Sequence, residues 1–167
     1  MTVAPPGAGT PTGTVTFYAN GTPVGTADAT GNTASLQISD LGVGSHTITA
    51  VYDGDTNYAA SPPSNGITQT VNRAGTEVKI TSDGNPSVIG KDVTFTVTVT
   101  AVAPGTGTPT GAVDLYIDGI LDDTYPLVNG SASVLISGLD VGSHTIDAEY
   151  TGDNMYDVSD GRMTQTV

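Results

Sequence analysis

Both histidines of the chain, His46 and His144, lie in the same six-residue phrase, VGSHTI, which occurs twice. Imidazole is the commonest metal ligand and the usual general base near neutral pH. A zinc site needs several converging ligands, but the chain has no cysteine and its two histidines are 98 residues apart. Ser45 adjoins His46, and adjacent strand residues point to opposite faces, so they do not form a catalytic dyad. We therefore predict a structural role for both histidines and no catalytic residue.

A partial calcium-loop pattern begins at Asp53, where the first three ligands of such a loop would alternate along the chain. The pattern then breaks, because a tyrosine stands where the loop needs glycine and a serine where it needs a bidentate glutamate. We therefore expect a turn with solvated carboxylates and no cofactor. If calcium does bind, the candidate ligands are Asp53, Asp55, Asn57 and, 98 residues after Asp55, Asp153.

Two sequences, Asn20-Gly21-Thr22 and Asn129-Gly130-Ser131, match the acceptor pattern for N-linked glycosylation. Asn-Gly is also the strongest short signal for a hairpin turn, because both of its residues readily adopt positive φ. We favour the turn interpretation and keep Asn20 and Asn129 as candidate glycosylation sites.

The charge balance restricts the partners of the chain. Seventeen acidic residues against four basic ones give a net charge of −13. Such a chain repels nucleic-acid phosphates and anionic lipid surfaces, so we expect no nucleic-acid partner. No apolar run is long enough to span a bilayer, so we expect no membrane insertion. The first five residues lack the features of a signal peptide, so an export signal would lie outside this chain.

The elements that carry these residues form a tandem repeat. Residues 10–58 align without a gap to residues 108–156, and 24 of the 49 pairs are identical. A period near 100 residues indicates two domains rather than the short units of a solenoid. We place them at residues 1–71 and 76–167, with a linker at 72–75.

Within each repeat the apolar residues alternate with polar ones, as in a half-buried strand. Gly, Pro, Asn and Asp clusters separate these runs at the spacing of a β-sandwich. In the second repeat we predict seven strands, at residues 77–82, 92–100, 112–117, 120–125, 132–137, 144–150 and 163–167.

The first repeat lacks the counterparts of the first two strands, because Thr2 aligns with Thr100 near the end of the second. We therefore predict an incomplete domain of five strands. A sandwich without two strands exposes core and an unpaired edge. Two explanations stay open: the chain is a piece of a longer array, or another chain supplies the missing strands.

Several phrases resemble the bacterial immunoglobulin-like repeats: PTGTVTFYANGTPVG, LGVGSHTITAVYDGDTNYAAS, PTGAVDLYIDG and LDVGSHTIDAEYTGDNMY. The resemblance implies an all-β fold of tandem immunoglobulin-like Greek-key sandwiches and a non-enzymatic role in an extracellular or cell-surface protein. It implies a stalk, spacer or fibre whose partners are neighbouring repeats or identical subunits. The alternative is an adhesin or carbohydrate-binding module that holds a sugar or host protein with loops at residues 53–58 or 104–110.

The resemblance also gives the histidines a specific place. In antibody-type domains, a tyrosine two residues before the sixth-strand cysteine bonds back to the backbone of the preceding corner. His46 and His144 stand two residues before Ile48 and Ile146, which take the cysteine position. We therefore predict that each imidazole N–H donates to a corner carbonyl.

Overall fold

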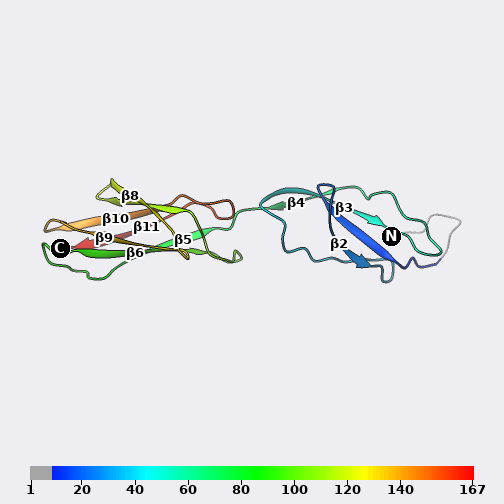
Figure 1. The fold of residues 1–167 in the computed structure, drawn as a ribbon, viewed down its shortest axis with the longest axis horizontal. Coiled ribbons are helices and arrows are strands. Elements are labelled where there is room, and N and C mark those ends of the chain that lie inside the picture. The colour runs from blue at the N-terminus through cyan, green and yellow to red at the C-terminus, as the bar shows by residue number, and fades with distance from the viewer. Residues whose placement is uncertain (1–8) are drawn as a thin grey trace. The chain divides into compact units, whose positions relative to one another are not determined.

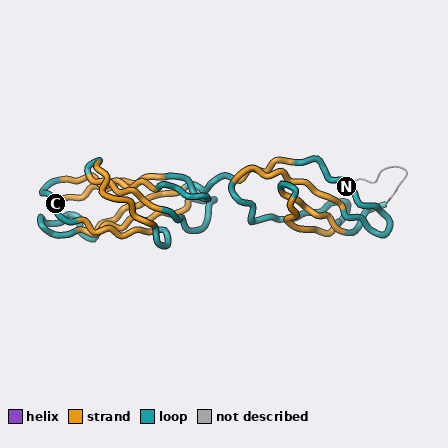
Figure 2. The backbone as a smooth tube through the Cα atoms, turned by 45° about the horizontal axis from the view of Figure 1, so that its top comes forward, coloured by secondary structure: helices purple, strands orange, loops and turns teal. Residues whose placement is uncertain are grey.

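The computed structural model describes residues 9–167 and divides the chain into two compact units, Met1–Asn72 and Arg73–Val167. These units are the first and second repeats, and each is described by itself. All regular elements of the described residues are strands, which confirms the all-β prediction (Figure 2). Among them no helix long and apolar enough to cross a bilayer occurs.

The second repeat is a two-layer sandwich of antiparallel strands (Figure 1). One sheet has the order β11-β10-β7-β8 and the other the order β5-β6-β9. Its seven strands are β5 (Thr76–Ser82), β6 (Val93–Ala101), β7 (Ala112–Ile117), β8 (Ile120–Pro126), β9 (Ser131–Ile136), β10 (Ser143–Tyr150) and β11 (Ser159–Thr166).

Strict alternation along β6 places one side chain in two between the layers. Val93, Phe95, Val97 and Val99 are buried, and the threonines between them face outward or lie half-buried. The opposite sheet contributes Val113, Leu115, Ile146, Ala148 and Tyr150 to the same core. Removing this much apolar surface from water is the main favourable term that holds the two layers together.

The first repeat is a single four-stranded sheet with the order β2-β1-β3-β4. Its strands are β1 (Thr14–Ala19), β2 (Thr22–Asp28), β3 (Gly44–Tyr52) and β4 (Ile67–Val71). They correspond to β7, β8, β10 and β11, and the described residues contain no counterpart of β5 and β6.

The predicted fifth strand of the first repeat is wrong. It would be the counterpart of β9, at residues 34–39, but this segment is extended and forms no ladder. In the second repeat β9 pairs with β6. Without a β6, residues 34–39 have no strand to pair with, although Ala34, Leu36 and Ile38 still turn inward and are half-buried.

The connection between the repeats is shorter than the predicted linker at 72–75. The Ala74 amide donates to the Met155 carbonyl, and the Ala74 carbonyl accepts from the Asp157 amide, both at 2.9 Å. The Gly75 carbonyl accepts from the Val102 amide. These bonds fix Ala74 and Gly75 within the second repeat, so Asn72 and Arg73 alone connect it to β4.

Candidate functional site

Each histidine holds the corner that leads into its strand. The Nε2 of His46 lies 2.8 Å from the Gly42 carbonyl oxygen, and the Nε2 of His144 lies 2.9 Å from that of Asp140. A carbonyl only accepts, so each imidazole carries its proton on Nε2 and donates it. The bond spans four residues in both repeats, from strand β3 or β10 back to the corner.

The second imidazole nitrogen meets a different partner in each repeat. Nδ1 of His144 lies 2.8 Å from a carboxylate oxygen of Asp118, whereas Nδ1 of His46 lies 3.4 Å from the side-chain nitrogen of Asn20. An amide N–H donates to Nδ1 of a neutral imidazole, whereas a carboxylate requires a proton on Nδ1. The corner of the first repeat therefore has an amide where the second repeat has a carboxylate, and only the second forms an ion pair, when His144 is protonated.

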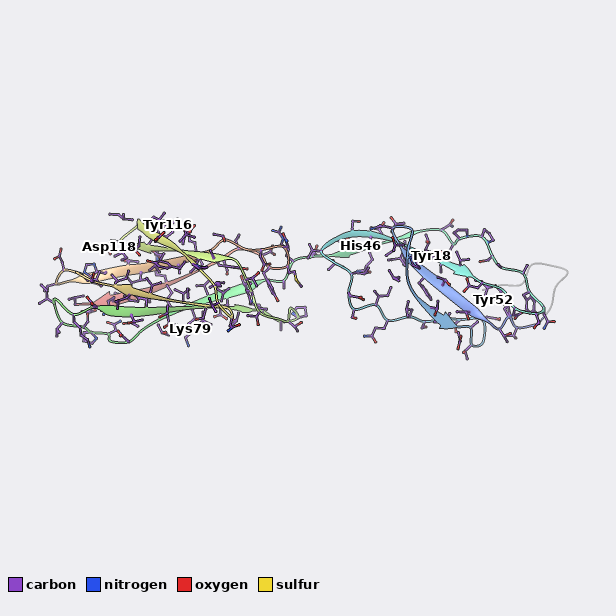
Figure 3. The ribbon with its side chains drawn as sticks, in the orientation of Figure 1. Tyr18, His46, Tyr52, Lys79, Tyr116 and Asp118 are labelled. Atoms are coloured by element: carbon purple, nitrogen blue, oxygen red, sulfur yellow. The ribbon has the colours of Figure 1, made fainter. Side chains whose placement is uncertain are left out.

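Both partners sit at the tip of a hairpin and brace the neighbouring strand. Asn20 and Asp118 have φ of 49° and 52°, and each precedes a glycine of positive φ, as a tight hairpin turn requires. Their Oδ1 atoms accept from the amides of Thr47 and Thr145 at 2.8 Å. Figure 3 labels Asp118 at the β7–β8 turn and His46 in the first repeat.

The ion pair changes the acidity of both its members. The Asp140 carbonyl and the Asp118 carboxylate raise the pKa of His144, and partial burial opposes them. The bond from His144, followed by that from the Thr145 amide, lowers the pKa of Asp118. Sequence reasoning placed the histidines but missed these partners, although the repeat alignment does set Asn20 against Asp118.

Replacing either histidine with alanine is expected to lower the melting temperature of its own repeat. The change removes the corner bond, worth about 1 kcal/mol, which corresponds to roughly 4–8 °C in a domain of this size. Differential scanning calorimetry of His46→Ala and His144→Ala measures the shift, with Ser45→Ala as an exposed control. Unchanged melting in both histidine variants would refute the corner role.

Replacing Asp118 with Asn is expected to weaken the pH dependence of the second repeat, because the carboxylate is lost while the bond from His144 to the Asp140 carbonyl stays. The raised pKa of His144 stabilises the fold fully below its unfolded value of about 6.5, and this contribution is lost as pH rises through the folded pKa. The lowered pKa of Asp118 stabilises the fold above about 3.9, and this contribution is lost as pH falls through its folded pKa.

Melting temperature plotted against pH should therefore peak for the second repeat between about pH 4 and 6.5 and be flatter in Asp118→Asn. Asn20→Asp, the reverse change, should introduce the same peak into the first repeat. Superimposable pH profiles for wild type and Asp118→Asn would contradict the ion pair.

The candidate calcium ligands Asp53 and Asp55 accept hydrogen bonds that stabilise a turn. The Asp55 carboxylate accepts from the Thr12 amide and hydroxyl and from the amides of Asn57 and Tyr58, over 2.7–2.8 Å. Asp53 accepts from the Thr16 hydroxyl at 2.8 Å, on a neighbouring strand. Within residues 9–167, no three acidic or histidine side chains gather as a metal site would need.

Asp153 repeats this arrangement in the second repeat. It accepts from the Thr110 amide and hydroxyl and from the amides of Met155 and Tyr156. Burial alone would raise the pKa of Asp153, but these hydrogen bonds lower it to about 2. The equivalent hydrogen bonds to Asp55, from Thr12, Asn57 and Tyr58, outweigh the effect of burial and hold the pKa of Asp55 well below its usual range. Each carboxylate therefore ties the loop before β1 or β7 to the loop after β3 or β10.

The two candidate glycosylation sites differ in what their side chains do. Both Asn20 and Asn129 are exposed, with φ of 49° and 52°. The Asn20 side chain is engaged by Thr47 and His46, as described above. Asn129 lies in the turn that leads into β9, where Val128 and Ser131 pair through their backbones. A glycan on Asn20 would compete with the contact to His46.

The outer face of the β11-β10-β7-β8 sheet bears an open hollow of about 690 Å³. Its charged and aromatic lining includes Asp114, Tyr116, Asp147, Glu149, Asp160 and Arg162. Arg162 pairs with Asp147, so the remaining carboxylates leave the hollow acidic. The counterparts of Asp114, Asp147 and Glu149 in the first repeat are Thr16, Thr49 and Val51, so this character belongs to the second repeat alone.

Comparison with known proteins identifies the family of both repeats. The family model of the bacterial Ig-like domain (group 3) matches residues 1–72 and again residues 80–167. A search of curated proteins gives no significant match. A solved structure of fibronectin(III)-like modules of Clostridium thermocellum CbhA is similar with a TM-score of 0.44 and 18% identity, covering 96% of this chain and 80% of that one.

Proposed function

Because the chain belongs to the bacterial Ig-like domain (group 3) family, we propose that it is a structural repeat of an extracellular surface protein or fibre. The observation that carries the proposal is the use of the polar residues in both repeats. His46 and His144 bond to corner carbonyls, and Asp55 and Asp153 accept four hydrogen bonds each from neighbouring loops. The side chains first considered as metal ligands or bases thus form hydrogen bonds that stabilise the fold.

A spacer works by keeping its domains folded under load. The antiparallel sandwich of the second repeat and its buried core support this role. Single-molecule pulling of the full chain should give one abrupt unfolding event for the 92 residues from Thr76 to Val167. The gain in length should be their extended length of roughly 300–330 Å minus the distance between the ends of the folded repeat. Gradual extension of the second repeat at low force, without such an event, would exclude a load-bearing role.

Location at the cell surface is supported by the common occurrence of this family in surface and extracellular proteins. The acidic composition also supports it, because a large net charge opposes non-specific association. Antibodies raised against the chain should label intact cells of the source organism as strongly as permeabilised ones. Labelling that requires permeabilisation would refute an extracellular location.

The alternative is an adhesin or carbohydrate-binding role, and one observation favours it. Tyr116 lies in the acidic hollow on the outer face of the second repeat, where an aromatic ring could stack on a sugar (Figure 3). Of the two loops first considered for binding, residues 53–58 have both carboxylates engaged internally, and residues 104–110 contain no carboxylate and are tied to Asp153 through Thr110. A glycan array with wild type and Tyr116→Ala separates the roles: a signal lost in Tyr116→Ala supports binding, and no signal supports the spacer.

A further inference from the structure

The first repeat leaves part of its inward face uncovered. We define the open face as the inward residues Ile48, Ile67 and Gln69 of β3 and β4, together with the extended segment 34–41. Ile67 is 67% exposed and Gln69 is exposed. Both nevertheless lie on the side of their sheet that is equivalent to the core side of the corresponding sheet in the second repeat. Ile48 is half-buried, whereas its identical counterpart Ile146 is 0% exposed.

The second repeat shows what covers this face in the complete domain. Met163, the counterpart of Ile67, packs against the core to which β5 and β6 contribute Val78, Ile80, Phe95 and Val97. Gln165, the counterpart of Gln69, is 0% exposed. Its side-chain amide donates to the Gly84 carbonyl at 2.8 Å and to the Ser87 hydroxyl at 3.2 Å, both in the loop between β5 and β6.

The backbone of segment 34–41 is also unpaired. Its counterpart β9 forms a ladder with β6, from Val93↔Ile136 to Thr98↔Ser131. Residues 34–41 make no backbone–backbone hydrogen bond with other described residues. Leu36 nevertheless packs on β2, because a methyl group added at Gly25 would lie 2.8 Å from its side chain. The segment is therefore held in place as a strand edge that lacks its partner.

We propose that the open face binds an antiparallel strand pair with the pattern of β5 and β6, and that it does so also when the pair is offered as a separate polypeptide. One strand would pair with residues 34–38, as β6 pairs with their counterparts in β9. Its alternating Val, Ile and Phe side chains would cover Ile48 and Ile67, and the connecting loop would receive the amide of Gln69. This is addition of strands to an exposed edge, and it goes beyond the spacer role without depending on it.

Charge favours such a segment over a second copy of the whole chain. Residues 73–102 contain three basic and three acidic residues and are neutral, whereas residues 1–72 contain four aspartates and no basic residue. A second copy would bring a net charge of −13 against another −13. Two open faces packed together would also leave the backbone of residues 34–41 unpaired, which buried polar groups do not tolerate.

The test adds a synthetic peptide of residues 73–102 to the full-length chain and follows amide hydrogen exchange. We expect exchange in residues 34–38 to slow at least about tenfold on saturation, with one peptide bound per chain. A control peptide with Phe95→Asp and Val97→Asp should give no slowing, because it would place two charges in the core.

The acceptor variant is Ile67→Asp in the full-length chain. Ile67 is largely exposed, so the variant should fold as wild type does, but docking would bury its carboxylate, and binding should weaken at least about tenfold. Ile120→Asp, at a 74% exposed residue of the second repeat, is the matched control and should bind normally. The proposal is overturned if wild type shows no slowing, if Ile67→Asp binds equally well, or if the chain alone dimerises through this face.

Discussion

Ile146→Ala is expected to lower the free energy of unfolding of the second repeat by about 2–5 kcal/mol, whereas Ile48→Ala should cost the first repeat clearly less. The two isoleucines stand in the same phrase and on equivalent strands. Ile146 is 0% exposed between two sheets, so its truncation leaves a cavity lined on both sides. Ile48 is half-buried on a face that lacks its second sheet, so less contact is lost.

Native-state hydrogen exchange measures this difference repeat by repeat. Amides of β10 report on the second repeat and amides of β3 on the first, so the two unfolding reactions need not be separated in a bulk transition. Ile120→Ala, at an exposed residue, serves as the surface control. Equal losses for Ile48→Ala and Ile146→Ala would mean that the first repeat has a fully formed core, which contradicts its single sheet.

Asp153→Ala should destabilise the second repeat by about 2–3 kcal/mol at neutral pH. The carboxylate accepts four hydrogen bonds, and its removal leaves the amides of Thr110, Met155 and Tyr156 without that acceptor. Tyr156 is buried, so water replaces the lost bond poorly at that amide. Chemical denaturation monitored by circular dichroism gives the value, with Asp153→Asn expected to lose less because it keeps one acceptor oxygen.

The same side chain predicts an acid limit. The pKa of Asp153 is lowered to about 2, so its stabilisation is present above the unfolded value of about 3.9 and is lost as pH falls through about 2. The difference between wild type and Asp153→Ala should therefore be constant near neutral pH and shrink in strong acid. A difference that grows on acidification would contradict the hydrogen-bonded turn.

The strands of the second repeat could be predicted closely because alternation and turn residues agree along its whole length. Residues 112–117 were predicted as a strand, and β7 has those bounds. The segment 34–39 has the same alternation as β9 and nearly the same residues, yet it is no strand. A β-strand needs a neighbouring strand to hydrogen-bond with, and the alternation within residues 34–39 carries no information on whether that neighbour is present.

The positions of the two histidines at the corners could be predicted, because the repeated phrase that contains them is visible in the sequence alone. Their partners depend on the hairpin reaching across the sheet, from residue 20 to 46 and from 118 to 144, which local sequence does not encode. The linker was overestimated for a related reason. Ala74 reads as a linker residue, but its backbone pairs with residues 155 and 157, more than 80 positions later.

The asparagine at the corner of the first repeat, Asn20, also makes this turn a candidate site of slow deamidation. Asn20 is followed by Gly21, and in such a pair the glycine nitrogen can attack the side-chain carbonyl carbon of the asparagine with loss of ammonia. Water then opens the resulting cyclic imide to aspartate or isoaspartate. The aspartate product is the residue that the second repeat already holds at position 118, in the same turn and beside the same imidazole. Ageing at this one bond would thus convert the corner of the first repeat into the charged form of the second, whereas the isoaspartate product would lengthen the hairpin backbone and break the match.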